Sequence, residues 1–515
     1  MQGIEAGWWL LFFGAFGLCL GSFLNVVIYR IPRDISLREP RWSFCPGCLH
    51  RIAWYDNLPL FSYIQLGGNC RSCGMRISPR YPLIEILGAL TTLILFDAFF
   101  IAHSHSGIGG YFVRTPVGAT LTWQVSDDWP IYLAHVVLFG GLLAMSAIDI
   151  EYYWVDVRFT WCAAFAGFVL HAIWSPPAPD TWVRPGDAMG AAALAATATL
   201  ALTALIFRAR YHDPGCDHCA HDEHVPLLAP IFAGAPGAIA DHEEESPEPP
   251  PTAPRSLVAV RIALWAAGLM LLLLVGGAWL DAIDVDLHLP PIIRWAPVFV
   301  LFFCLIVAGG MPRRHSDSAI LAAIEAERHS ARRVALGEAA MLLPAIAIGV
   351  AVWYAVTQTA SADTIHTWLH WSPNREWHPV QGLATAAVGF IIGGGIGWLV
   401  RIVATLIMGR EAFGTGDIHM MAAAGCVAGW PVVLIGFVLC SFLALLGWLL
   451  LVPFKRARAI PLGPWLSIAF LIVVVLYGPI VKSHWVQNVV TVFSRPAETI
   501  HNVSNLPFTP LAPED

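Results

Sequence analysis

The stretch that decides the fold is residues 384–417, ATAAVGFIIGGGIGWLVRIVATLIMGREAFGTGD. Ala384 to Met408 form an apolar run that is long enough to cross a lipid bilayer as a helix. The stretch ends on Asp417, where the next apolar run begins, and a carboxylate at the mouth of a membrane helix is by default a functional candidate. Gly414 and Gly416 place no side chain beside it, so another backbone can approach closely.

Composition indicates that such runs recur along the chain. Of 515 residues, 57% are hydrophobic and 13% are charged, and the mean hydropathy is +0.64. A soluble chain carries about 25% charged residues, so a soluble hydrolase is excluded. We predict an all-α polytopic membrane protein with about twelve transmembrane helices. The predicted spans are 8–29, 83–102, 131–148, 159–174, 188–207, 258–280, 292–310, 335–356, 384–408, 420–430, 431–452 and 462–477.

The basic residues predict the orientation of these spans. Clusters of arginine and lysine occur at 30–80, 208–210, 313–333 and 455–458, and the span count puts them all on one side, which is then cytoplasmic. The same count places Asp417 at the cytoplasmic face. Residues 241–254 are acidic and proline-rich, typical of a disordered linker. The first run leads straight into Arg30 without a cleavage site, which favours a retained helix over a signal peptide.

Four cysteines in the first basic segment have the spacing of a metal site. Cys45 and Cys48, then Cys70 and Cys73, form two CxxC pairs about twenty residues apart, which suits a closed, structural Zn²⁺ site with four thiolate ligands. Two disulfides are the weaker interpretation on the reducing cytoplasmic side. A second group of potential ligands follows the fifth span, and a metal site and a solvated loop remain equally open for it. That group is Cys216, His218, Cys219, His221 and His224.

A single aspartate does not easily serve as both acid and base, so Asp417 needs a partner. Asp149 ends the third predicted span on the same side, and Asp156 would share its helix face if that helix continued. Two carboxylates brought together titrate as a pair, which lets one activate a water while the other protonates a leaving group. The alternative is that Asp149 and Asp417 are ordinary helix ends at the water interface.

These motifs resemble those of the type IV prepilin peptidase family, GxGD-type membrane aspartic proteases. The opening GSFLNVVIYR (21–30) and the cysteine loop (45–85) carry the most specific resemblance. The remaining matching segments are AMSAID (144–149), GREAFGTGD (409–417) and IPLGP (460–464).

The resemblance implies a catalytic pair, Asp149 and Asp417, with Gly414 and Gly416 as supporting residues. It implies removal of a basic leader from prepilins or pseudopilins at the cytoplasmic face of the bacterial inner membrane, and Glu151 is a candidate contributor to an acidic site for that leader. Many members also N-methylate the new terminus with S-adenosylmethionine. This chain has no glycine-rich turn for that cofactor, and we expect Gly393–Gly395 to be a helix-packing face.

The chain departs from the family in three places. The proline expected before Asp156 is absent, and His419 stands where the family has lysine. The chain is also about twice the usual length, the excess being an insertion with an even number of spans, which returns Asp417 to the side of Asp149. The predicted regions are a first helix 1–30, a zinc loop 31–82, membrane core 83–185, inserted region 186–378, membrane core 379–482 and a tail 483–515.

The insertion leaves two hypotheses of different class. One is the peptidase, with prepilin substrates, the lipid bilayer and pilus or secretion assembly proteins as partners. The alternative is a catalytically altered relative that acts as a membrane scaffold or transporter. Nucleic-acid binding is not expected, because the arginines are accounted for by membrane orientation.

Overall fold

The computed structural model describes residues 2–101, 121–152, 155–174, 185–211, 291–309, 331–358, 362–371, 378–411, 413–451, 461–477 and 480. The predicted span 258–280, the linker 241–254 and the ligand group at 216–224 lie outside these residues. The longer helices are α1 (Gln2–Arg30), α3 (Arg80–Phe96), α5 (Leu121–Tyr152), α6 (Val157–Ile173), α7 (Asp187–Tyr211), α10 (Pro291–Gly309), α12 (Ala331–Gln358), α14 (Pro379–Met408), α15 (Thr415–Ala428), α16 (Trp430–Leu451) and α17 (Gly463–Val475).

The shorter elements are α2 (Phe61–Gln65), α13 (Ala362–Leu369), the 3₁₀ turns at Ile31–Arg33 and Trp54–Asn57, and a π-helical turn, η3 (Asp97–Ile101). Two isolated β-bridges lie in the cysteine loop. The prediction of an all-α membrane protein is confirmed at this level.

Seven helices in the described part of the chain are long and apolar enough to cross a membrane: α1, α3, α5, α7, α12, α14 and α16. Three further apolar helices, α6, α10 and α17, are shorter. The short predicted span 420–430 corresponds to α15, which has 14 residues. The total of about twelve spans stays a prediction.

The ends of α14 show how the sequence sets up the loop before Asp417. Pro379 opens the helix, where its fixed φ and its missing N–H cost nothing. Gly409 ends it in the left-handed conformation, φ 67°, and its amide donates to the Thr405 carbonyl at 2.8 Å. The next helix, α15, begins at Thr415.

Helices α14 and α15 pack backbone to backbone. A Cβ at Gly393 would lie 2.5 Å from the Met421 carbonyl oxygen, and one at Gly394 would lie 3.2 Å from the Ala422 Cβ. Gly395 faces open space. The predicted packing role of this glycine run is therefore confirmed for its first two residues.

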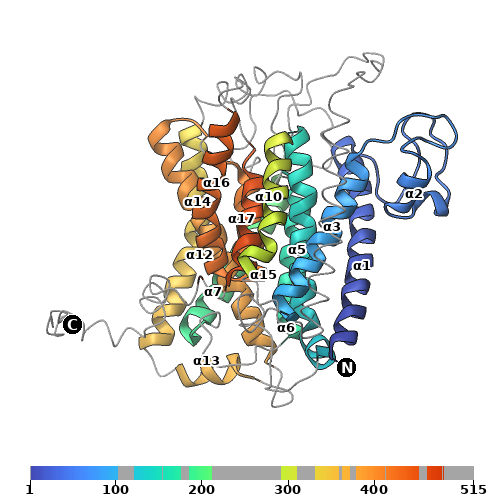
Figure 1. The fold of residues 1–515 in the computed structure, drawn as a ribbon. Coiled ribbons are helices and arrows are strands. Elements are labelled where there is room, and N and C mark those ends of the chain that lie inside the picture. Colours follow the sequence, from blue (N-terminus) through green and yellow to red (C-terminus); the bar gives the residue numbers. More distant parts are fainter. Residues whose placement is uncertain are drawn as a thin grey trace, which may run out of the picture.

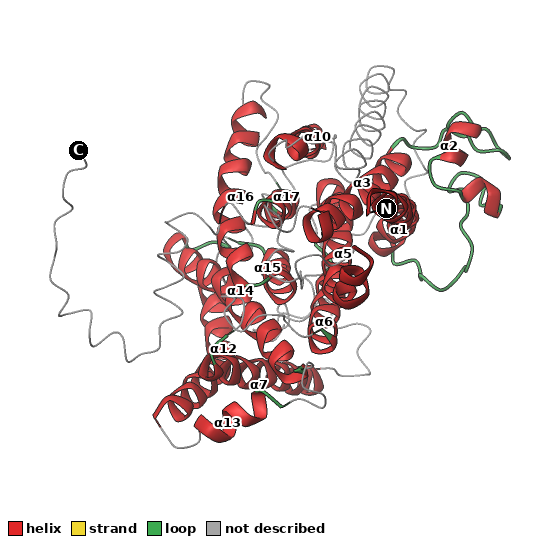
Figure 2. Ribbon diagram, turned by 60° about the horizontal axis from the view of Figure 1, so that its bottom comes forward, coloured by secondary structure: helices red, strands yellow, loops and turns green. Residues whose placement is uncertain are grey.

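The inserted region packs against both parts of the membrane core. Helices α7 and α12 pack on each other and on α14, whereas α10 packs on α5, α16 and α17. Figure 2 shows α7, α12 and α13 together on one side of the bundle. The Trp295 indole of α10 donates to the buried Asp97 carboxylate of η3 at 2.7 Å, which ties inserted and core helices together.

The two ends of the bundle differ in what they carry. Figure 1 shows the loop containing α2 beside the carboxyl end of α1, while α13 lies across the opposite end. Arg80 at the start of α3 pairs with Glu151 near the end of α5. The Gly463 amide at the start of α17 donates to Asp149, also near the end of α5. The cysteine loop and Asp149 therefore share one end of the molecule.

Candidate functional site

Asp149 lies in the last turn of α5 and is 6% exposed. Its Oδ2 accepts a hydrogen bond from the Gly463 amide at 3.2 Å. Three residues earlier, Ser146 donates to the Ser467 hydroxyl at 2.9 Å, a second link between α5 and α17. Asp149 is therefore held by the first turn of the last helix, which can donate a backbone N–H because that turn has no earlier carbonyl to bind.

Asp417 lies in the first turn of α15, whose N-cap is Gly414. A carboxylate in this position is stabilised by the partial positive charge of the helix amino end. A Cβ at Gly414 would lie 3.0 Å from Asp417 Oδ2. Asp417 Oδ1 is buried and accepts no hydrogen bond within the described part of the chain.

Glycines allow the two aspartate segments to meet. A Cβ at Gly463 would lie 2.8 Å from Asp149 Oδ2 and 3.5 Å from the sulfur of Met420, which is one helical turn after Asp417. A Cβ at Gly416 would lie 2.5 Å from the Cβ of Val155, which follows α5. The space beside Gly416 is thus occupied by Val155, which lies six residues after Asp149. The two carboxylates are close enough to repel each other electrostatically.

Arg401 organises the loop before Asp417. It projects from α14 and pairs with Glu338 of the inserted α12, with Nη2–Oε1 at 2.9 Å. Both side chains are buried, at 7% and 1% exposure. Arg401 Nη1 also donates to the Glu411 carboxylate and to the Phe413 carbonyl. Three acceptors from two elements therefore converge on one guanidinium and fix the chain next to Gly414.

The sequence analysis missed Arg401, Glu338 and the contact of Gly463 with Asp149. A charged residue inside an apolar run is costly and marks a functional or structural site. Arg401 and Glu338 each interrupt a predicted span, so that signal was available for both. It did not reveal that they pair, since they lie 63 positions apart.

Glu151 and Asp156, which the sequence suggested as neighbours of the two aspartates, form ion pairs with other residues. Glu151 forms an ion pair with Arg80, Nη1–Oε2 2.5 Å, which offsets the negative charge it could offer to a basic leader. The α5 helix ends at Tyr152, so Asp156 does not share a helix face with Asp149. Instead Asp156 caps α6, accepting from the Arg158 amide at 2.8 Å and pairing with the Arg158 side chain.

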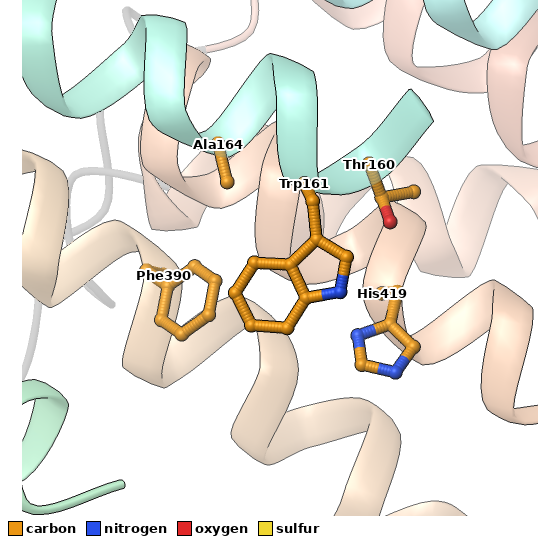
Figure 3. A pocket seen from close by; sticks show the side chains of 5 residues that line it. All are labelled: Thr160, Trp161, Ala164, Phe390 and His419. Atoms are coloured by element: carbon orange, nitrogen blue, oxygen red, sulfur yellow. The ribbon is translucent and has the colours of Figure 1, made fainter. Parts of the chain in front are cut away.

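His419 faces away from the aspartates. Positions two apart on a helix lie on different faces, so a residue two after Asp417 points elsewhere. Its ring lies 6.0 Å from that of Trp161 on α6. Figure 3 shows His419 and Trp161 side by side in a small pocket that Thr160, Ala164 and Phe390 complete.

The four predicted cysteine ligands come together. Their sulfur atoms all lie within 4.8 Å of one another, and Cys45 Sγ is 3.9 Å from Cys73 Sγ. Thiolates around a tetrahedral Zn²⁺ lie about 3.8 Å apart, whereas a disulfide bond is about 2.0 Å long. Backbone amides of Cys73 and Ser72 bond the Cys70 sulfur and lower the pKa of that thiol to about 7. The geometry fits the predicted metal and disfavours two disulfides.

Each cysteine pair sits in a turn of the same design. The Leu49 amide donates to the Cys45 carbonyl at 2.8 Å, and the Gly74 amide donates to the Cys70 carbonyl at 2.9 Å. The bridges Phe44–Arg51 and Asn69–Arg76 close the two turns. Two equivalent knuckles therefore present two sulfur atoms each toward a common centre.

Comparisons with known proteins match part of the chain. Residues 15–99 match the bacterial peptidase A24 N-terminal domain. The chain is 55% identical over 80 residues (16% of the chain, 24% of the relative) to a prepilin leader peptidase/N-methyltransferase of Myxococcus xanthus. It is 35% identical over 183 residues (32% and 57%) to a type 4 prepilin-like proteins leader peptide-processing enzyme of Escherichia coli. It is 34% identical over 158 residues (26% and 45%) to a prepilin leader peptidase/N-methyltransferase of Pseudomonas aeruginosa.

The chain spans less than two thirds of the length of each of these relatives. No solved structure matches it. The matched domain contains the motif at 21–30 and all four cysteines. Through this N-terminal domain, the chain is related to the type IV prepilin peptidase family.

Proposed function

We propose that the protein is a membrane aspartic endopeptidase that removes leader peptides from type IV prepilins or pseudopilins. The observation that supports this proposal is that Gly463 contacts both Asp149 and Met420, one helical turn after Asp417, at the end of the bundle that also carries the cysteine loop. The printed names of the relatives support the substrate class. We further propose that this end faces the cytoplasm of a bacterial inner membrane, as the arginine distribution predicts.

The two carboxylates can divide the work of peptide hydrolysis. One, ionised, takes a proton from a water molecule, whose oxygen then attacks the scissile carbonyl. The other, protonated, gives its proton to the leaving amide nitrogen as the C–N bond breaks. Asp149 is held by the Gly463 amide, while Asp417 Oδ1 has no hydrogen-bond partner among the described residues. That difference favours Asp417 as the carboxyl that engages the water or the substrate.

The four cysteines would hold a structural Zn²⁺. With all four positions filled by protein, the ion has no open site for chemistry, and its role is to fix the loop 31–82. N-methylation by S-adenosylmethionine is proposed from the names of the relatives alone. Other proposed partners are the bilayer and pilus or secretion assembly proteins.

Replacement of either aspartate tests the peptidase directly. Asp149→Asn and Asp417→Asn should each abolish leader removal from a co-expressed prepilin, because each removes one half of the acid–base pair. Asp34→Asn is the matched control, since Asp34 is exposed and its left-handed backbone suits asparagine. Persistent processing in both dyad variants, with protein still in the membrane, would overturn the proposal.

A further inference from the structure

A second cluster of metal-ligating side chains lies at the end of the bundle opposite the cysteine loop (Figure 1). It joins Asp187, at the start of α7, to His366 of α13 and to His370, which directly follows α13 and continues its hydrogen bonding through its amide. His366 Nδ1 is 2.5 Å from Asp187 Oδ2, and His370 Nε2 is 3.1 Å from Asp187 Oδ1. The two imidazole centroids are 4.3 Å apart.

The fold places these three side chains together by packing the neighbouring residues. Ile365 and Leu369 of α13 pack into an apolar cluster with Ala191 of α7, Val356 of α12 and Ala384 of α14. Positions 366 and 370 are one residue further around the helix and four residues apart, so both rings lie on one stripe beside the apolar face. That stripe faces the first turn of α7, where Asp187 lies. The cluster is therefore supported by α13 and the three helices against which it packs.

The distances and ligand types fit a metal ion. All three donor atoms lie within 4.8 Å of one another. Imidazole and carboxylate ligands bound at about 2.0–2.1 Å around a tetrahedral ion lie roughly 3.3 Å apart, so small side-chain rotations suffice. Two imidazoles favour a transition metal over Mg²⁺ or Ca²⁺, which prefer sites made only of oxygen.

We propose that Asp187, His366 and His370 bind a divalent transition-metal ion, with Zn²⁺ the best match and water in the fourth position. The exposed fraction of the His366 side chain is 61%, so the ion would exchange with solvent on this side. Its effect would be to fasten α13 to the start of α7. This site is independent of the aspartate pair and of the cysteine cluster.

Zinc content tests the proposal on the full-length protein in detergent. The protein is stripped with a chelator, dialysed against buffered Zn²⁺ and analysed for bound metal. Asp187→Asn, His366→Ala and His370→Ala should each lose one zinc ion per chain, or weaken its binding by roughly tenfold or more. Thr364→Ala, on an exposed position of the same helix, should bind as the wild type does. Cys45→Ser should keep the ion held by the histidines.

A second readout separates metal binding from simple hydrogen bonding. In a Cys45→Ser background, which removes the cysteine site, Zn²⁺ should raise the thermal midpoint because it binds the folded form, and it should not do so once Asp187→Asn is added. Asparagine keeps the size and one acceptor oxygen of Asp187, so this variant preserves the fold. Equal zinc content in the wild type and in Asp187→Asn would overturn the proposal, and would mean that the histidines only hydrogen-bond the carboxylate.

Discussion

Arg401 bridges Glu338 of the inserted α12 and the Phe413 carbonyl, one residue before Gly414. The bridge connects the inserted region to the loop that carries Asp417. The guanidinium is buried, and both of its carboxylate partners come from elements other than its own helix. The inserted region is thereby coupled to the geometry of the candidate site.

Glu338→Ala should destabilise the protein strongly. Removing one partner of a buried ion pair costs about 3–5 kcal/mol, because the other charge stays buried. Glu411→Gln should cost less, since Glu411 is 36% exposed. Thermal midpoints in detergent would measure both.

A double variant separates stability from positioning. Arg401→Met with Glu338→Leu removes both charges and should recover much of the lost stability. Leader cleavage should stay low, because the Phe413 carbonyl loses its donor. Cleavage at the wild-type rate in this double variant would contradict a positioning role for Arg401.

Gly416→Ala should impair cleavage by displacing the Asp417 turn. The added methyl would lie 2.5 Å from the Val155 Cβ, and such overpacking costs about 1–3 kcal/mol. Gly395→Ala is the matched control, since that position faces open space and alanine favours the helix by about 0.5–1 kcal/mol. The thermal midpoint and the cleavage rate are the measurements. Adding Val155→Gly to Gly416→Ala should restore part of the activity, and a failure to do so would argue against this contact.

Chelation should loosen the cysteine loop without unfolding the helices. Four thiolates hold the two knuckles together, and their folding energy comes largely from the ion. We expect a strong chelator, or Cys45→Ser, to open residues 31–82 to limited proteolysis. Cys19→Ser is the control, because Cys19 lies on α1 outside the cluster. A loop equally resistant with and without metal would count against structural zinc.

The Asp56–Arg71 pair predicts acid sensitivity of the same loop. Arg71 Nε and Nη2 donate to Asp56 at 2.8 and 2.6 Å, which holds the pKa of that carboxyl below its usual value. The pair therefore stabilises the loop above the unfolded pKa of about 3.9, and this stabilisation is lost as pH falls through the lower folded pKa. Asp56→Asn should remove that part of the pH dependence in hydrogen exchange, and Glu39→Gln should not. Identical profiles for Asp56→Asn and the wild type would refute the pair's contribution.

The sequence predicted most of the helices, because apolar runs of bilayer length have few alternative structures. It predicted the cysteine cluster because two CxxC turns each fix a pair of ligands locally. The predicted span 384–408 differs from α14 at its start, since the helix already begins at Pro379 and includes Gln381 and Gly382 in its first turn. Apolar patterning cannot locate such an extension.

Long-range polar contacts could not be predicted in the same way. Asp187 and His366 lie 179 positions apart, and Asp149 and Gly463 lie 314 apart. The periodicity of hydrophobic residues does not predict such contacts, because they depend on how the helices pack against one another. The same limit explains Glu151, whose partner Arg80 lies 71 positions away. Asp156 is a different case, because the end of α5 at Tyr152 leaves it as the local cap of α6, where it pairs with Arg158.

The Trp295–Asp97 bond has a consequence for how this chain can be divided. Rejoining residue 185 to residue 379 would take the indole donor from Asp97 and the carboxylate of Glu338 from Arg401 in a single cut. Asp97 would then lose one hydrogen bond, and Arg401 would lose its most deeply buried acceptor while keeping Glu411 and the Phe413 carbonyl. Lost hydrogen bonds of buried polar groups are costly. The inserted helices therefore stabilise buried polar groups of the membrane core, and a shortened version of this protein should have a lower free energy of unfolding than the full chain.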